Sequence, residues 1–137
     1  MSEHRIVTAP GLAPPSGYAH AVVATPGWTV YLGGQTALGP AGKIIGTTMA
    51  EQFDVAAANV VTALAAAGGR PRDLVALTIY VTDMAAYRSS LAELGEVYQR
   101  HFGKRYVASA LFGVTELFDQ DAMVELVGVA VLPEVAV

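Results

Sequence analysis

The most constraining feature of this 137-residue sequence is one capped, amphipathic helix placed between segments that alternate like β-strands. Thr48 and Glu51 have the spacing of a capping box, in which two side chains satisfy amides of the first helical turn. Apolar residues then recur at three- and four-residue spacing as far as Ala67, which places them on one helical face, and Gly68 follows as a C-cap. The pattern predicts a helix over residues 48–67 with one face to bury.

Strand-like segments lie on both sides of this helix. Strands are expected at residues 21–24, 28–32, 44–45, 74–81, 107–115 and 123–132. A second helix, capped by Asp83, is expected to end near Phe102. Prolines and glycines make residues 1–18, which include His4, an irregular lead-in. The first three strands are expected to form an antiparallel meander.

This order of elements predicts an α+β fold, one domain over residues 1–137, in which two helices pack on one face of a single sheet. The other sheet face also carries apolar residues, so a neighbouring subunit is expected to cover it. The composition agrees, because 53% of residues are hydrophobic and only 15% are charged. The alternative is that the alanines clustered at residues 56–67 inflate this fraction.

Composition also excludes several classes of protein. There are no cysteines, hence no disulfides or thiolate ligands, and the three histidines are too widely separated for a metal site. The N-terminus lacks the apolar core of a signal peptide, and no apolar run reaches the roughly 18 residues of a membrane span. The net charge of −4 argues against nucleic acid as a partner. A cytoplasmic protein without metal or organic cofactor is expected.

A few polar residues and glycines stand out as candidates for chemistry. Glu125 lies in an otherwise apolar strand, so it is either an acid/base or one half of a structural ion pair. His20, beside Tyr18, is a weaker candidate. The pair Gly33-Gly34 is either a close backbone approach or a wall of amides facing a ligand, because no helix follows it as in a phosphate loop.

The order of short motifs from about residue 16 to 132 resembles the RidA/YjgF family of enamine and imine deaminases. Residues 16–22 (SGYAHAV) are similar to the family's opening segment Gly-Pro-Tyr-Ser-Gln-Ala-Val, and residues 30–35 (VYLGGQ) to its strand ending in Ser-Gly-Gln. Residues 81–84 (VTDM) resemble its next junction, and residues 124–130 (VELVGVA) resemble Val-Glu-Ile-Glu-Ala-Ile-Ala.

The resemblance implies a chorismate-mutase-like homotrimer with a mixed six-stranded sheet in each subunit. The sheets would line a central barrel, and small-molecule pockets would lie in clefts between subunits. In the family an arginine grips the substrate carboxylate, a tyrosine shapes the pocket and a glutamate positions the attacking water. Tyr18 and Glu125 take the last two roles by resemblance. Besides His20 and the two glycines, the ligand-binding positions implied are Ser109, Ala110, Leu111 and Val127.

The chain departs from the family pattern at the arginine. The segment Pro-Ala-Arg-Ser/Thr aligns with residues 107–110, so Ser109 stands at the arginine position. Val127 replaces a second glutamate, and Ala19 and His20 replace a serine and a glutamine. Serine supplies no charged fork for a carboxylate. The sequence therefore predicts a divergent imine hydrolase for a ligand other than 2-aminoacrylate, or alternatively a metabolite-binding trimer without catalysis.

Overall fold

The computed structural model describes residues 3–134 and has α+β architecture. Along the chain the elements are β1 (Arg5–Val7), β2 (Ala21–Val23), β3 (Gly27–Tyr31), α1 (Met49–Ala66), a 3-10 turn η1 (Pro71–Asp73), β4 (Leu74–Val81), α2 (Met84–Ser89), α3 (Leu91–Phe102), β5 (Ala108–Gly113) and β6 (Val124–Pro133). The main helix and the last three strands confirm the expected order of elements in the second half of the chain.

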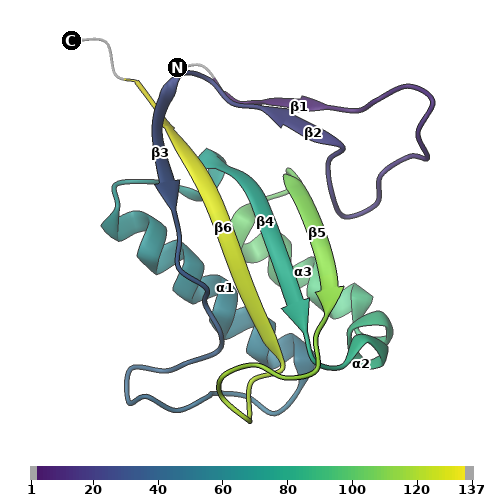
Figure 1. Ribbon diagram of the computed structural model, residues 1–137, viewed down its shortest axis with the longest axis vertical. Helices are drawn as coiled ribbons and strands as arrows, with labels where there is room; N and C mark the ends of the chain where they lie inside the picture. Colours follow the sequence, from purple (N-terminus) through teal and green to yellow (C-terminus); the bar gives the residue numbers. More distant parts are fainter. Residues whose placement is uncertain (1–2, 135–137) are drawn as a thin grey trace.

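The central sheet has four strands in the order β3-β6-β4-β5. Strand β4 pairs with β5 in parallel, and β6 pairs with both β3 and β4 in antiparallel fashion, so the sheet is mixed as predicted. Helices α1 and α3 lie behind this sheet, on one face (Figure 1). The prediction of six strands in one sheet is wrong, because β1 and β2 form a separate two-stranded sheet.

Four other expectations for the chain are corrected. Residues 1–18 are not wholly irregular, because β1 lies within them, and β2 pairs with β1 in place of joining a meander with β3. Residues 44–45 form no strand, since Ile44 makes only an isolated bridge to Leu38. The second helix is interrupted at Ser90, whose φ of −112° and ψ of 15° separate α2 from α3.

Helix α1 begins and ends as its sequence predicts. The Thr48 side chain accepts a hydrogen bond from the Glu51 amide, and the Glu51 carboxylate accepts one from the Thr48 amide. These contacts lower the pKa of Glu51, mainly through the backbone amides of residues 47 and 48. Gly68 ends the helix with a φ of +91°, a backbone conformation that other residues rarely adopt.

The two faces of the central sheet have different surroundings. Leu77 and Val81 on β4, with Val124 and Leu126 on β6, have no exposed surface and pack against the helices. The alternate positions point the other way, because side chains along a strand alternate between faces. On that open face Tyr31 remains 81% exposed, so nothing within residues 3–134 covers it. The open face is therefore a largely apolar surface that residues 3–134 leave uncovered.

Two histidines fix residues 5–23, which we call the N-terminal hairpin. His4 is only 5% exposed, and its Nε2 lies 2.8 Å from the Val131 carbonyl while its Nδ1 accepts a hydrogen bond from the Thr25 amide. His20 holds the loop of the hairpin, accepting from the Ala9 amide. His4 is thus a buried anchor, which corrects its assignment to an irregular lead-in.

Within the described residues, no helix has the length and hydropathy needed to cross a bilayer. The same part of the chain contains no cluster of three or more His, Asp or Glu side chains that could hold a metal ion.

Candidate active site

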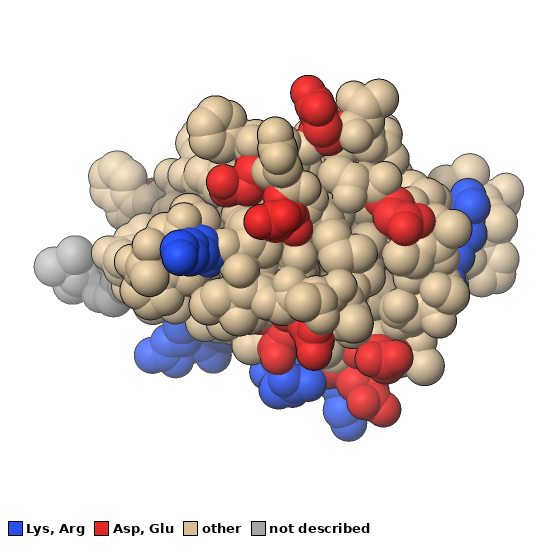
Figure 2. All heavy atoms as spheres, turned by 90° about the horizontal axis from the view of Figure 1, so that it is seen from below, with Lys and Arg blue, Asp and Glu red and all other residues tan. Residues whose placement is uncertain are grey.

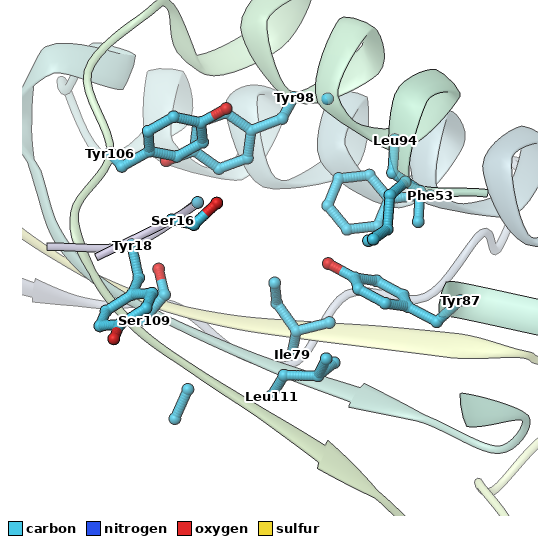
Figure 3. A pocket seen from close by; sticks show the side chains of 14 residues that line it. Ser16, Tyr18, Phe53, Ile79, Tyr87, Leu94, Tyr98, Tyr106, Ser109 and Leu111 are labelled. Atoms are coloured by element: carbon cyan, nitrogen blue, oxygen red, sulfur yellow. The ribbon is translucent and has the colours of Figure 1, made fainter. Parts of the chain in front are cut away.

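A cavity of about 530 Å³ opens between the helices, β5 and the loop of the N-terminal hairpin. This volume is within the range of about 300–1,000 Å³ that is typical of small-molecule sites. Figure 3 shows the side chains of the 14 residues that line it. They are Ser16, Gly17, Tyr18, Phe53, Ile79, Tyr87, Leu91, Leu94, Gly95, Tyr98, Tyr106, Ser109, Ala110 and Leu111.

The hairpin loop brings Tyr18 to this cavity. Its neighbour Ala19 donates a backbone hydrogen bond of 2.9 Å to the Val107 carbonyl and forms a parallel bridge with Ala108. This bridge places Tyr18 and Ser109, which are adjacent to the bridged residues, at the same end of the cavity (Figure 3). Two residues distant in sequence therefore share one wall because the loop returns along β5.

Strand β5 supplies a second wall. Ser109 is paired with Leu77, and Leu111 with Ile79, so both β5 side chains lie on the helix-covered face of the sheet. The Ser109 hydroxyl donates to the Val107 carbonyl at 3.2 Å, which leaves its oxygen available as a neutral polar group. Ala110 also lines the cavity, at the free edge of the sheet.

Three tyrosines from the other side complete the cavity. Tyr87 comes from α2, Tyr98 from α3, and Tyr106 from the segment before β5. Burial raises the pKa of Tyr98 to about 12, and burial together with the neighbouring Tyr106 raises the pKa of Tyr87. Both phenols are therefore neutral at physiological pH and can donate hydrogen bonds.

Glu125 and the glycines lie elsewhere in the chain. Glu125 pairs with Tyr80, which places its side chain on the open face of the sheet, away from Ser109. A Cβ at Gly34 would overlap the Glu125 carboxylate, so Gly34 permits a close approach. Gly33 next to it is exposed, and Val127 lies two residues further along the same face of β6. The predicted site residues thus form two groups on opposite faces.

Comparison with known proteins identifies the family. The sequence model of a family described as endoribonuclease L-PSP matches residues 8–132. A RutC family protein of Pyrococcus abyssi is 27% identical over 131 residues, which are 95% of this chain and 98% of that protein. The chain belongs to the RidA/YjgF family.

Solved structures of RidA/YjgF proteins have the same fold. A Rid family protein of unknown function from Yersinia pestis, YyfB, has a TM-score of 0.86 at 27% identity, over 96% of this chain and 100% of that one. A YjgF/YER057c/UK114 family protein from Mycobacterium tuberculosis is 34% identical, with a TM-score of 0.62 over 85% of this chain and 87% of that one. Of these two relatives, the one with the higher sequence identity to this chain therefore has the lower TM-score.

None of the cavity-lining residues is charged, so the cavity offers no arginine of the kind that RidA/YjgF deaminases use. Arg105, the nearest arginine before Ser109 in sequence, does not line the cavity. Its guanidinium donates instead to the carbonyls of Arg72 and Leu74. These hydrogen bonds use one terminal nitrogen, Nη2, and tie Arg105 to the start of β4, while its Nη1 is buried without a hydrogen-bond partner among residues 3–134.

His20 is close to the cavity without lining it. Its Nε2 lies 3.0 Å from the Ala13 carbonyl, and its ring makes an edge contact with Tyr18 at 5.9 Å between centroids. The imidazole therefore supports the loop that carries Tyr18.

Sequence reasoning missed the aromatic part of the cavity, namely Phe53 and the three tyrosines at 87, 98 and 106. Phe53, Tyr87 and Tyr98 fit the apolar faces of the predicted helices, a pattern that is typical of core residues. A signal was present, since tyrosine brings a hydroxyl that a purely apolar core position does not need.

Proposed function

We propose that this RidA/YjgF protein is a divergent enamine and imine hydrolase that acts on a ligand other than 2-aminoacrylate. The single observation that carries the proposal is the cavity between Tyr18 and Ser109, which is lined without any charged side chain. A carboxylate in such a cavity would lose its hydration without gaining a counter-charge. The cavity suits an imine whose substituents are uncharged.

The reaction requires a group that activates water. In imine hydrolysis water adds to the carbon of the C=N bond while its proton passes to a base, which returns that proton to the nitrogen. The carbinolamine hydroxyl then gives its proton, through the same base, to the amino group, so that ammonia leaves and a carbonyl remains. Glu125 is the proposed base, and the Tyr18 hydroxyl would orient the nitrogen or the water. Ser109 adds a neutral hydrogen-bonding oxygen beside Tyr18.

The separation of Glu125 from Tyr18 supports a site that two subunits share. In one chain these residues lie on opposite faces of the sheet. A homotrimer, the assembly expected from the family resemblance, would cover the exposed apolar face and bring Glu125 of one subunit towards the cavity of the next. We therefore propose an intersubunit active site in a homotrimer.

A second candidate is a metabolite-binding trimer without catalysis. The specific observation in its favour is that the cavity as lined by one chain holds no acid or base. If the neighbouring Glu125 does not reach it, the cavity binds a ligand without hydrolysing it.

RNA is a poorer ligand for this protein, although the family description names an endoribonuclease. Acidic residues outnumber lysines and arginines by 12 to 8. Figure 2 shows one face on which acidic side chains are interspersed with basic ones and no basic stripe is formed. Phosphate binding requires such a stripe.

The test combines an imine panel with two conservative variants. Unsubstituted imines are generated in the assay by an amine or amino-acid oxidase, from amines with and without a carboxylate, and the ammonia released by hydrolysis is measured. Glu125→Gln should reduce turnover by about 10²–10⁴-fold, and Tyr18→Phe should reduce it less. Glu116→Gln is the matched control and should leave turnover unchanged, because Glu116 is an exposed carboxylate in the β5–β6 connection that does not line the cavity.

Several results would decide against the proposal. Unchanged turnover in Glu125→Gln and Tyr18→Phe would remove these residues from the site, and a monomer in sedimentation would rule out the shared cavity. Stabilisation by an uncharged ligand without hydrolysis of any imine would favour the binding protein. Ser109→Arg should raise turnover of carboxylate-bearing imines, since it restores a charged partner.

A further inference from the structure

The side of the cavity opposite the wall made by Tyr18 and Ser109 has a composition that the proposed hydrolysis does not explain. Its side chains come from all three helices and from the segment before β5, and Figure 3 shows them facing that wall. We call this side the tyrosine subsite; it consists of Phe53, Tyr87, Leu94, Tyr98 and Tyr106.

The tyrosine subsite contains no formal charge, because its members are all aromatic or aliphatic. Burial keeps the Tyr98 phenol neutral by raising its pKa to about 12, and burial raises the pKa of Tyr87 as well. The nearest cation is Arg105, which acts on the pKa of Tyr98 but does not line the cavity and donates to the carbonyls of Arg72 and Leu74. A carboxylate or phosphate in the subsite would therefore lie against uncharged side chains alone, and the lining favours an uncharged part of a ligand.

The arrangement of the rings favours a planar aromatic group. Tyr98 and Tyr106 are stacked with centroids 4.8 Å apart and 29° between their planes, and Phe102 braces Tyr98 edge-on at 5.0 Å. This pair forms a fixed aromatic wall, and Figure 3 shows Tyr87 and Phe53 across the cavity from it. Aromatic rings prefer to stack offset or edge-on against other rings, which such walls permit.

The Tyr87 hydroxyl provides a polar anchor. Figure 3 shows it directed into the cavity, and no hydrogen bond to it is formed within residues 3–134. The Tyr98 hydroxyl, by contrast, already faces the Arg105 carbonyl at 3.5 Å. The Tyr87 hydroxyl can therefore donate a hydrogen bond to an acceptor on a ligand, such as a carbonyl oxygen.

We propose that the tyrosine subsite binds an uncharged aromatic ring of the ligand, with the Tyr87 hydroxyl donating a hydrogen bond to an acceptor attached to that ring. The inference rests on the proposed function in using the same cavity, and it narrows the substrate class to imines that carry a neutral aromatic substituent. Tyr87 is then a specificity-determining residue, while water activation belongs to Glu125.

The test measures binding of four matched probes to the purified full-length protein by calorimetry. Benzamide is neutral and aromatic with a carbonyl acceptor; benzoate is its anionic counterpart, benzamidine its cationic counterpart, and cyclohexanecarboxamide its non-aromatic counterpart. Benzamide should bind at least about tenfold more tightly than each of the others, because only it satisfies both the uncharged walls and the aromatic faces. Tighter binding of benzamidine would mean a cation–π site, and tighter binding of benzoate would mean a hidden cation; either overturns the inference.

Two variants separate the anchor from the fold. Tyr87→Phe removes one oxygen and should weaken benzamide binding roughly five- to tenfold, while leaving toluene, which has no acceptor, unaffected. Tyr31→Phe is the matched control, since Tyr31 is 81% exposed on β3, at the edge of the sheet opposite β5, and does not line the cavity. Equal benzamide affinity in Tyr87→Phe and Tyr31→Phe would refute the role of Tyr87.

Failure of the subsite and failure of the hydrolase can be told apart because binding is measured without turnover. If benzamide binding depends on Tyr87 but the protein hydrolyses no imine, the tyrosine subsite is supported and the proposed hydrolase activity is refuted. If the protein hydrolyses imines, but Tyr87→Phe and aromatic substituents on the imine do not change the rate, the hydrolase activity is supported and the tyrosine subsite is refuted.

Discussion

The helix-and-sheet body, residues 27–134, and the N-terminal hairpin are held in place by different kinds of contact. In the body, β4 and β6 bury residues such as Leu77 and Leu126 completely beneath the helices. In the hairpin most side chains of β1 and β2 are exposed or half-buried. Its attachment depends on directional hydrogen bonds, above all those of His4 to the Val131 carbonyl and the Thr25 amide.

This difference has a consequence for the cavity. The hairpin loop carries Ser16, Gly17 and Tyr18, whereas the body supplies the aromatic walls and Ser109. Segments with few buried apolar contacts open at a lower free energy than a packed core. We therefore expect the Tyr18 wall to be the part of the cavity that adapts to a ligand, and the tyrosine subsite to be the rigid part.

The largest expected effect tests the body. Leu77→Ala removes a side chain with no exposed surface between β4 and the helices, and it should lower the free energy of unfolding by roughly 2–5 kcal/mol. Leu12→Ala is the control in the hairpin loop, where leucine is 61% exposed, and should change stability by less than about 0.5 kcal/mol. Urea denaturation measures both. Similar losses in the two variants would contradict the contrast between body and hairpin.

A smaller and more local effect is expected at the hairpin anchor. His4→Ala removes a hydrogen bond to the Val131 carbonyl and leaves the Thr25 amide without its acceptor. The free energy that keeps β1 and β2 closed should fall by about 1–3 kcal/mol. Hydrogen exchange should become faster in residues 5–7 and 21–23 and stay unchanged in β4 and β6.

The same substitution at another histidine is the control for this effect. His101→Ala changes α3, which has no part in the hairpin, so exchange in residues 5–7 and 21–23 should remain slow. If His4→Ala destabilises the whole chain to one common extent, the hairpin and the body unfold as a single unit and the comparison fails.

The body was largely predictable from sequence because its signals are local. The capping box of Thr48 and Glu51 and the alternation from Leu74 to Val81 depend on residues close together in the chain. The separate hairpin was not predictable, because its position depends on a contact between His4 and Val131, 127 residues apart. Strand propensity predicts where a strand forms, but it does not predict which other strand it pairs with.

The helix break and the cavity show two further limits. Apolar residues continue at helical spacing through Ser90, so periodicity gives no sign that α2 and α3 are separate; the Ser90 hydroxyl donates to the Ala86 carbonyl at the break. Family resemblance placed Tyr18 and Ser109 in a site, and the structure brings them to one cavity. In the proposed trimer Glu125 would join them through contacts between chains. Periodicity and motif spacing carry no information about such contacts.

The smallest effect concerns the surface between the helices of the body. Asp54 on α1 accepts from His101 at 2.5 Å and from Arg100 at 3.1 Å, both on α3. These contacts, with the hydrogen bond from His101 foremost, lower the pKa of Asp54 in the folded protein. The Asp54 side chain is 39% exposed, so solvent screens the interaction. Asp54→Asn should therefore lower the free energy of unfolding at neutral pH by less than about 1 kcal/mol.

The sign of the pH dependence follows from the direction of this shift. A carboxyl whose pKa is lower in the folded than in the unfolded chain stabilises the fold above its ordinary pKa, and the contribution disappears as the pH falls through the lowered value. The difference in unfolding free energy between the original protein and Asp54→Asn should therefore be fully present at about pH 7 and smaller at about pH 3, below the ordinary pKa of about 3.9 for an aspartate. Urea denaturation at both pH values measures it, with His101→Gln as a partner in a double-mutant cycle. A difference that grows on acidification would show that Asp54 does not stabilise the contact between α1 and α3 through its ionised form.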